Sequence, residues 1–402
     1  MAFNKRQKMT TWFDVSTTIY FPPPAIGIPR VEMSLLEHLT LNDAANLHYC
    51  AYHQATDRYY EVAKADVMKF VHRHQHKTTE PIENIAFLTG SNGQLEQDDV
   101  FCAGDTFISV GFNWRANLGN LARIYGIRQR LGLRVVMCCH DIIPIKFTHF
   151  VPGMESYYAP YIEDMGKNAD HILCDSHHTR MDLIVWLESK GVLPPKLSIF
   201  PLGCELQVNY SGEWGDKIAP FKNTPYIMLV STIEKRKNHA IICQAYKILW
   251  EQGVTNLPHL LFVGGIGHGG AELMTDIQSD QQLHHQVSVV SGLRDDDLSM
   301  LYQNCLFSVY PSLYEGFGLP IAESLGYGKL CLTSTSSSMP EVGGIFAEYA
   351  DPYDANAWAR LILRYTQFPE QLVYRERYIA VGYESPTWQA AAAHLLKASV
   401  MF

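Results

Sequence analysis

The feature that most constrains the fold of this chain is a regular alternation of short apolar runs with amphipathic segments in its second half. Each apolar run has the length of a β-strand, and each amphipathic segment carries apolar residues at helical spacing. The expected strands cover residues 226–230, 259–263, 287–290, 306–310 and 330–333, and the expected helices cover residues 238–252, 271–278, 295–303 and 320–327. This alternation predicts a mostly parallel sheet with helices on both faces.

The first half of the chain shows the same alternation. Its expected strands cover residues 12–20, 106–111, 134–139 and 171–174, and a helix is expected over residues 113–132. Three prolines, Pro22 to Pro24, predict a loop after the first strand. Pro29 suits the first turn of a following helix, whose apolar face carries Val31, Leu35, Leu36 and Leu39. A second α/β unit is therefore expected here.

Residues 205–224 separate the two series. They lack periodicity and contain Gly212, Gly215 and Pro220, a composition typical of a linker. A length of 402 residues also suits two domains better than one core. We therefore predict an α/β protein with a first domain over residues 1–210, a second domain over residues 211–384 and a terminal helix within residues 385–402.

Composition and charge exclude several classes of protein. The formal charge of −9 argues against a nucleic-acid binder, which needs a basic surface to neutralise phosphates. No apolar stretch reaches the ~20 residues that span a membrane, and the basic N-terminus lacks the apolar core of a signal peptide. We therefore expect a cytoplasmic protein. The nine cysteines form no Cys-x-x-Cys motif, so neither a disulfide framework nor a structural metal site is expected.

The most informative motif covers residues 310–323, which read Tyr-Pro-Ser-Leu-Tyr-Glu-Gly-Phe-Gly-Leu-Pro-Ile-Ala-Glu. A strand ends here, a glycine-containing turn follows, and a helix begins at Pro320. Such a turn lets backbone N–H groups approach a ligand, and a helix N-terminus favours phosphate. Glu315 lies in the turn and Glu323 lies on the helix, so both can accept hydrogen bonds from hydroxyls at the carboxyl edge of the sheet. The alternative is an ordinary strand–helix connection with solvated glutamates.

A second motif is the basic run Lys235-Arg236-Lys237, which leads into a helix after the strand at 226–230. Cations at a helix N-terminus suit a diphosphate. Alone, such a run is more often a solvated surface. Its place after an apolar strand, together with the glutamate motif, favours a phosphate site.

The motif over residues 310–323 resembles the donor site of the retaining GT-B glycosyltransferases of family 4, where two glutamates are separated by seven residues around Gly-Phe-Gly-Leu-Pro. The resemblance implies that Glu315 contacts the transferred sugar and that Glu323 contacts the nucleotide ribose. It also places four backbone amides beside the sugar and the diphosphate, those of Gly316, Phe317, Gly318 and Leu319. Residues 340–343, Pro-Glu-Val-Gly, match the family as well.

The resemblance extends to the first half of the chain. Gly27 begins Gly-Ile-Pro-Arg, where the family has a glycine loop between the donor phosphates and the acceptor. His140 begins His-Asp-Ile-Ile-Pro and resembles the family's His-Asp motif, whose histidine approaches the transferred sugar. A histidine at a strand end is also a common structural residue. Trp388 resembles part of a C-terminal helix that crosses back onto the first domain.

The same resemblance assigns the leaving diphosphate to Arg236 and Lys237. Many family members read Gly-Arg where this chain reads Ser231-Thr232, so these two cations are expected to supply most of the positive charge. Further donor-binding positions are implied at Ser231, Thr232, Gly264 and Leu293.

The implied fold is GT-B, with two Rossmann-like doubly wound domains facing a cleft. The implied reaction is transfer of a hexose with retention of configuration, without a metal or a resident cofactor, because the nucleotide sugar is a co-substrate. The run Ile-Glu-Lys-Arg-Lys-Asn at 233–238 resembles a form common among bacterial mannosyltransferases, which favours GDP-mannose. The expected acceptor is a glycan or lipid-linked oligosaccharide of a bacterial surface polysaccharide.

Contact with the inner membrane could use a basic patch on the expected helix 113–132, formed by Arg115, Arg123, Arg128 and Arg130. A plain solvated helix face is the alternative.

Other readings of the donor site remain. A UDP- or dTDP-sugar could replace GDP-mannose, and a GT-B epimerase or hydrolase would release sugar without an acceptor. From a different class, a non-catalytic sugar-nucleotide-binding protein would keep the site without turnover. The glycines at 265, 267 and 270 satisfy a dinucleotide fingerprint, but no ribose-binding acid follows at the right distance.

Overall fold

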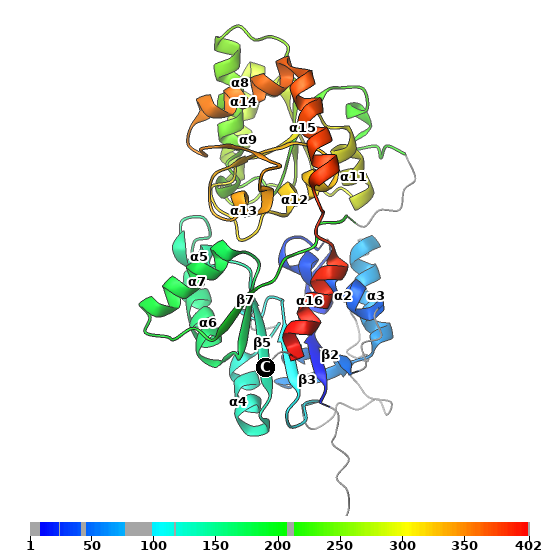
Figure 1. Cartoon of the computed structure of the whole chain (residues 1–402), viewed down its shortest axis with the longest axis vertical. Helices are drawn as coiled ribbons and strands as arrows, with labels where there is room; N and C mark the ends of the chain where they lie inside the picture. The colour runs from blue at the N-terminus through cyan, green and yellow to red at the C-terminus, as the bar shows by residue number, and fades with distance from the viewer. Residues whose placement is uncertain are drawn as a thin grey trace, which may run out of the picture.

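The computed structural model describes residues 9–23, 25–41, 46–76, 99–115, 118–206 and 213–400. These residues form two α/β domains that lie one above the other in Figure 1. Each domain is built on its own mainly parallel sheet. The predicted α/β class and the presence of two doubly wound units are therefore confirmed.

The first sheet has seven strands in the described part of the chain, in the order β3-β2-β1-β4-β5-β6-β7. They are β1 (Thr11–Asp14), β2 (Leu47–His53), β3 (Arg58–Val62), β4 (Thr106–Ser109), β5 (Arg134–Cys139), β6 (His171–Cys174) and β7 (Lys196–Ile199). Neighbouring strands are parallel except for β2 and β3, which form an antiparallel pair at one edge.

The second sheet has six parallel strands among the described residues, in the order β10-β9-β8-β11-β12-β13. They are β8 (Tyr226–Val230), β9 (His259–Val263), β10 (Val287–Val290), β11 (Ser308–Tyr310), β12 (Cys331–Ser334) and β13 (Glu348–Ala350). The strand order reverses between β8 and β11. Ligands of open α/β sheets bind outside the carboxyl ends of the strands at such a point.

Helices connect the strands of each sheet. Those of the first domain are α1 (Ser16–Tyr20), α2 (Ile28–Leu41), α3 (Lys64–His76), α4 (Leu121–Leu131), α5 (Ile143–Lys146), α6 (Glu155–Asn168) and α7 (His177–Ser189). Those of the second domain are α8 (His239–Glu251), α9 (Gly270–Ser279), α10 (Gln281–Gln286), α11 (Asp295–Asn304), α12 (Leu319–Gly326), α13 (Met339–Gly343), α14 (Ala355–Gln367) and α15 (Pro369–Gly382), with short 3₁₀ turns at Ala219–Phe221 and Lys235–Lys237. The last helix is α16 (Trp388–Val400).

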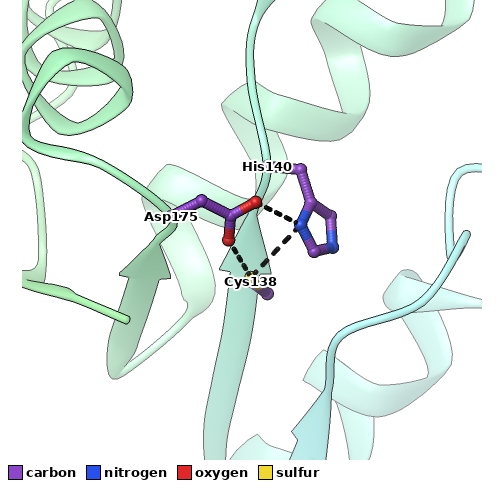
Figure 2. A group of neighbouring side chains, drawn as sticks. All are labelled: Cys138, His140 and Asp175. Atoms are coloured by element: carbon purple, nitrogen blue, oxygen red, sulfur yellow. Dashed lines mark hydrogen bonds and ion pairs between the residues drawn. The ribbon is translucent and has the colours of Figure 1, made fainter. Parts of the chain in front are cut away.

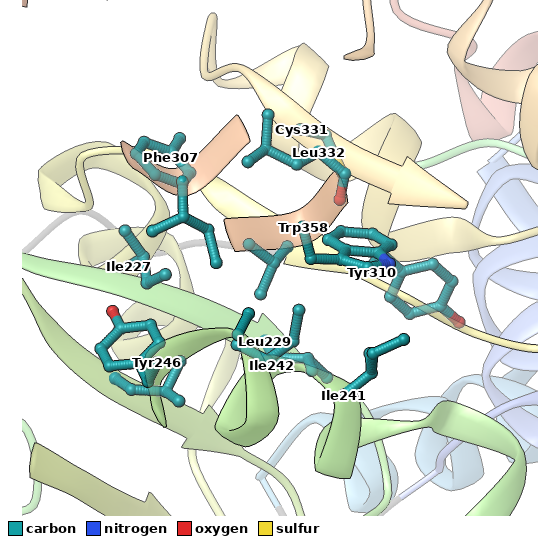
Figure 3. Packing of buried hydrophobic residues seen from close by; sticks show 14 of the residues in the cluster. Ile227, Leu229, Ile241, Ile242, Tyr246, Phe307, Tyr310, Cys331, Leu332 and Trp358 are labelled. Atoms are coloured by element: carbon teal, nitrogen blue, oxygen red, sulfur yellow. The ribbon is translucent and has the colours of Figure 1, made fainter. Parts of the chain in front are cut away.

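Strand β8 shows why the second sheet must be covered on both faces. Its alternate residues Ile227 and Leu229 pack into one apolar core, which Figure 3 shows, while Tyr226 and Met228 pack into another. Side chains alternate between the faces of a strand, so a continuous apolar run needs a core on each side. Trp358 of α14 is fully buried and packs into the core that contains Ile227 and Leu229.

Two predicted elements of the first domain differ from the structure. The strand expected over 12–20 ends at Asp14, and α1 follows, because the Asp14 carboxylate accepts hydrogen bonds from the backbone N–H and the hydroxyl of Ser16 and turns the chain. The helix expected over 113–132 begins only at Leu121. Asn120 caps it by accepting from the Arg123 N–H, and this cap sets the start.

The strands predicted in the second half agree with the structure to within two residues at each end. The predicted helices also agree closely, and α11 begins with three aspartates, Asp295 to Asp297. The hairpin of β2 and β3 was not predicted. Its strands mix aromatic, charged and histidine residues, so they lack the apolar run that marks a buried parallel strand.

The chain ends by returning to the first domain. Helix α16 lies beside α2, as the red and blue helices of Figure 1 show. The backbone N–H of Trp388 donates to the Glu205 carboxylate at 2.7 Å, and its indole N–H donates to the Glu205 carbonyl at 3.2 Å. The predicted boundary between residues 210 and 211 lies outside the described residues.

Trp388 is 2% exposed and packs in the core of the first domain, so its removal should be costly. We expect Trp388→Ala to lower the free energy of unfolding by about 3–5 kcal/mol, the usual cost of deleting a buried large side chain. Urea unfolding measures it. Tyr353→Ala is the control, because Tyr353 is 79% exposed and its loss should change stability little. An equal effect of both variants would show that the burial of Trp388 contributes little to stability.

Candidate active site

The predicted donor residues lie at the carboxyl ends of four neighbouring strands. Ser231 and Thr232 follow β8, Gly264 follows β9, Leu293 lies in the loop after β10, and Glu315 lies in the loop after β11. Because these strands are parallel and adjacent, the four loops meet at one edge of the second sheet. The point where the strand order reverses lies between the loops after β8 and β11.

Glu315 lies at the centre of a buried charge cluster. Its carboxylate contacts Lys237 Nζ at 2.6 Å and Arg236 Nη1 at 2.7 Å. It also accepts from the hydroxyls of Tyr310 at 2.9 Å and Ser312 at 2.5 Å. Burial alone would raise the pKa of Glu315, but the charges of Arg236 and Lys237 outweigh it and lower that pKa to about 2. The carboxylate is therefore ionised at neutral pH.

The two cations of this cluster are themselves buried. Burial and the neighbouring Arg236 charge lower the pKa of Lys237, while the Glu315 carboxylate opposes that shift. Arg236 also contacts the Glu234 carboxylate at 2.9 Å. Two cations thus face two carboxylates, and their formal charges cancel. A diphosphate that binds here must exchange with these ion pairs or use the remaining N–H groups of the two cations.

Lys235 differs from its two neighbours. It points outward and pairs with the exposed Glu272 at 2.9 Å. The three cations point in different directions because they occupy successive positions of a 3₁₀ turn, which has about three residues per turn, and Asn238 ends this turn with φ of 58°. The Asn238 amide donates to the carbonyls of Pro311 and Pro352, which holds the turn beside the glutamate loop.

Glu323 lies in α12 and is 2% exposed. Arg30 of the first domain donates to its Oε1 at 2.6 Å, and the Tyr302 hydroxyl donates to its Oε2 at 2.8 Å. The predicted ribose-binding carboxylate is therefore held by one residue from each domain. Neither Arg30 nor Tyr302 was assigned a role from the sequence.

The loop over residues 314–319, which we call the donor loop, lies against the first domain. The Gly316 carbonyl accepts from the hydroxyls of Ser176 at 2.6 Å and Thr179 at 3.1 Å. A Cβ atom at residue 316 would lie 2.0 Å from the carbonyl oxygen of His140, so only glycine fits. Gly318 has φ of 111° and precedes α12. Phe317 and Leu319 pack against the apolar core of the first domain.

Tyr314, at the start of the donor loop, reaches further into the first domain. Its hydroxyl lies 2.8 Å from Lys146 Nζ and 2.7 Å from His178 Nε2, and it donates to the Asp182 carboxylate. On the same face, the Glu341 carboxylate accepts from backbone N–H groups at the start of α7. These contacts bring the predicted motif at 340–343 against the first domain.

His140 follows β5 and is buried beside Asp175, which follows the adjacent strand β6 (Figure 2). Its Nδ1 lies 2.7 Å from the Asp175 carboxylate, and its Nε2 lies 2.7 Å from the Val110 carbonyl. Both partners are acceptors, so both ring nitrogens must donate. Burial lowers the pKa of His140, but the Asp175 charge and these hydrogen bonds outweigh it and raise the pKa. His140 is therefore an imidazolium paired with Asp175.

Cys138, His140 and Asp175 also form a group whose potential ligand atoms lie within 4.8 Å of one another. Two ligands of one tetrahedral zinc ion lie about 3.3 Å apart, given bonds near 2.0 Å. His140 and Asp175 are closer, at 2.7 Å, which is the distance of the hydrogen bond that Figure 2 draws between them.

The structure brings most predicted residues together, but not all in the expected way. The side chain of His140 points to Asp175 and Val110, while its backbone carbonyl lies against Gly316. Gly27 lies one residue before α2 with φ of 63°, and Ser231 Oγ contacts His239 at 3.4 Å. Asp175 could have been found from the sequence, because parallel strands β5 and β6 end side by side.

The predicted basic patch is divided between different partners. Arg123 and Arg128 form ion pairs with Asp99 and Asp170 at 2.5 and 2.6 Å. Arg115 lies outside α4 and over the Phe112 ring. The four arginines therefore do not form one free basic face.

Comparison with known proteins gives this site a context. Residues 212–382 match the family model described as "Glycosyl transferases group 1". The chain is 26% identical over 247 residues to the "Serotype-specific mannosyltransferase WbdA" of Escherichia coli, covering 60% of this chain and 30% of that protein. It is 32% identical over 142 residues to the "O-antigen chain mannosyltransferase B" of E. coli, covering 35% and 37% of the two chains. The chain thus spans about a third of the length of these curated relatives.

Solved structures show the fold over almost the whole chain. Sucrose-phosphate synthase from Thermosynechococcus elongatus superimposes with a TM-score of 0.63 at 16% identity, covering 97% of this chain and 98% of that one. Anabaena Alr3699/HepE in complex with UDP-glucose superimposes with a TM-score of 0.64 at 13% identity, covering 97% and 99%. The fold is GT-B, as predicted. Among the described residues, no helix combines the length and the apolar character needed to cross a membrane.

The His140–Asp175 pair should make stability depend on pH. Because its folded pKa is raised, the pair stabilises the fold fully below the ordinary histidine pKa of about 6.5 and loses this contribution as pH rises through the folded pKa. Asp175→Asn should therefore lower the free energy of unfolding by about 3–5 kcal/mol at pH 6, the cost of breaking a buried ion pair. At pH 9 the loss should be smaller.

Urea unfolding of both proteins at the two pH values measures this difference. Glu61→Gln is the matched control, because Glu61 pairs with His48 on the surface, where both side chains are about half exposed. Its effect should be small at either pH. An equal loss for Asp175→Asn at pH 6 and pH 9 would mean that His140 is neutral in the folded protein.

Proposed function

We propose that this chain, which belongs to the glycosyl transferases group 1 family through residues 212–382, transfers a hexose from a nucleotide sugar to a glycan or lipid-linked oligosaccharide. Our preferred donor is GDP-mannose. The observation that carries the proposal is the position of Glu315, Arg236 and Lys237. They form one buried cluster where the strand order of the second sheet reverses, and Glu315 lies in the donor loop, which contacts the first domain.

In this proposal the second domain holds the donor. Glu315 contacts the transferred sugar, and Glu323 accepts from the ribose. The N–H groups at the start of α12 lie beside the diphosphate, where a helix N-terminus favours negative charge. Ser231, Thr232, Gly264 and Leu293 line the same edge from the neighbouring loops, and Gly27 faces it from the first domain.

Catalysis in this proposal is electrostatic. Charge builds on the diphosphate as its bond to the sugar breaks, and Arg236 and Lys237 stabilise that charge. The Glu315 pKa of about 2 keeps its carboxylate ionised beside a sugar carbon that becomes electron-poor. His140 is held as a cation by Asp175, and its backbone carbonyl lies against the donor loop. We propose retention of configuration without a metal, in keeping with the family resemblance.

Two observations support mannose as the transferred sugar. The run at 233–238 resembles that of bacterial mannosyltransferases. The relatives found by sequence comparison are named mannosyltransferases. A UDP- or dTDP-sugar is the alternative donor, and a non-catalytic sugar-nucleotide-binding protein is the alternative outside enzymes. A lipid-linked acceptor would bring the protein to the inner face of the membrane.

A donor panel tests the proposal directly. Thermal unfolding is measured with GDP-, UDP-, ADP- and dTDP-sugars, and a ligand at 100 times its Kd should stabilise the fold by about 2.7 kcal/mol. Donor turnover is then measured with and without a lipid-linked oligosaccharide. We expect GDP-mannose to stabilise most and turnover to require the acceptor. Stabilisation without turnover would support the non-catalytic protein, and turnover without acceptor would support a hydrolase.

The basic turn offers a sharper test with an internal control. Lys237→Ala should weaken GDP binding about tenfold or more, because a charge-assisted hydrogen bond contributes about 1.5–3 kcal/mol. GMP lacks the β-phosphate, so its binding should change less. Lys235→Ala is the matched control, since Lys235 points to solvent and pairs only with the exposed Glu272 among its described ion pairs.

Isothermal titration of both variants with GDP and GMP separates the outcomes. If Lys237→Ala bound GDP as tightly as wild type, the buried cluster would be a structural ion-pair network and the diphosphate would bind elsewhere.

A further inference from the structure

A buried ion pair between Arg30 and Glu323 joins the two domains. Arg30 lies in the first turn of α2, and Glu323 lies in α12, 293 residues later in the chain. Nη1 of Arg30 donates to Oε1 of Glu323 at 2.6 Å, and the two side chains are 17% and 1% exposed. The Tyr302 hydroxyl donates to the other carboxylate oxygen. Each oxygen of Glu323 therefore has one donor from the protein.

The pKa of Arg30 depends on its carboxylate neighbours. Burial lowers the pKa of Arg30, but the nearby carboxylates of Glu323 and Asp295 outweigh burial and raise it. A buried carboxylate is costly unless it is paired and hydrogen-bonded. Arg30 thus pairs with the buried Glu323 carboxylate and fixes its orientation from the opposite domain.

Part of the hydrogen-bonding capacity of the pair is unused. Nη2 of Arg30 is buried and has no acceptor among the described residues. A carboxylate oxygen accepts two hydrogen bonds, so each Glu323 oxygen can accept one more. An unused donor on Arg30 therefore lies beside an unused acceptor on Glu323. Buried polar groups of proteins are nearly always satisfied, so a pair of this kind points to a ligand.

The combination of a donor and an acceptor selects the chemical class of that ligand. A hydroxyl group can give its proton to Glu323 and accept from Nη2 of Arg30 at the same time. A phosphate oxygen could accept from Arg30 but would be repelled by the Glu323 charge, and an ammonium group has no lone pair for Arg30. A hydroxyl is the group that satisfies both sides.

We propose that Arg30 is a nucleotide-binding residue that forms, together with Glu323, a clamp for a ribose hydroxyl of the donor. This inference rests on the proposed nucleotide-sugar function. Because each domain supplies one half of the clamp, the nucleotide enters while the domains are apart, and the clamp forms when they meet on it. Ribose recognition and domain closure are then one event.

The test compares GDP with 2′,3′-dideoxy-GDP, which lacks both ribose hydroxyls, by isothermal titration of the full chain. Wild type should bind GDP at least about 30-fold more tightly, since two hydrogen bonds to charged groups are lost without the hydroxyls. In Arg30→Lys the ratio of the GDP affinity to the dideoxy-GDP affinity should fall to about threefold, mainly because GDP binds more weakly. Lysine keeps a charge beside Glu323 but lacks the forked pair of donors.

Controls separate binding from folding. Arg360→Lys changes an exposed arginine that pairs with Asp354, and its ratio should equal that of wild type. Thermal unfolding of free Arg30→Lys should stay within a few degrees of wild type, because the ion pair is kept. A purely structural role for Arg30 would weaken both nucleotides equally and leave the ratio unchanged, which would overturn the proposal.

Two other outcomes are informative. If Arg30→Lys bound GDP and dideoxy-GDP more tightly than wild type, Arg30 would compete with the nucleotide for Glu323, and the clamp would be wrong. If wild type bound neither GDP nor UDP, the proposed function itself would fail, and the clamp with it. If Arg30→Lys binds nucleotide and its ratio of GDP affinity to dideoxy-GDP affinity equals that of wild type, only the clamp is rejected.

Discussion

The contact between the donor loop and the first domain is the constraint on which the rest of this structure depends. The His140 carbonyl lies where a side chain at Gly316 would have to be, and hydroxyls of Ser176 and Thr179 hold the Gly316 carbonyl. Tyr314 anchors the start of the same loop in the first domain. Since Glu315 lies between these two anchors, its position relative to the first domain is set by the docking of the domains and not by the second sheet alone.

The buried charges around this contact are balanced in pairs. Glu315 faces two cations, Glu323 faces Arg30, and His140 faces Asp175. Charges in a low-dielectric interior are tolerated only with such partners. A donor that brings its own diphosphate must therefore exchange with existing ion pairs. The binding affinity will therefore reflect the difference between the new contacts with the diphosphate and the ion pairs that they replace. For this reason the partners of each charged group matter as much for binding as the group itself.

The sequence predicted the second domain better than the first, for a physical reason. Parallel strands buried on both faces are continuous apolar runs, so the limits of β8, β9 and β10 can be read directly. The β2–β3 hairpin lacks such runs, and the turn after Asp14 depends on one side-chain cap, so neither follows from the sequence pattern. Within the site, residues that follow strands were placed correctly at the carboxyl edges, because the end of a strand fixes where its loop emerges.

By itself, then, the sequence determined two α/β domains and the residues that lie at the carboxyl ends of their strands. These properties follow from local periodicity and from glycine and proline at turns. Only the tertiary structure decided which charges pair, that His140 is held by Asp175, and that Arg30 reaches Glu323. Such pairs join residues far apart in the chain across the contact between two domains. Their formation depends on how the two sheets dock, which no local pattern encodes.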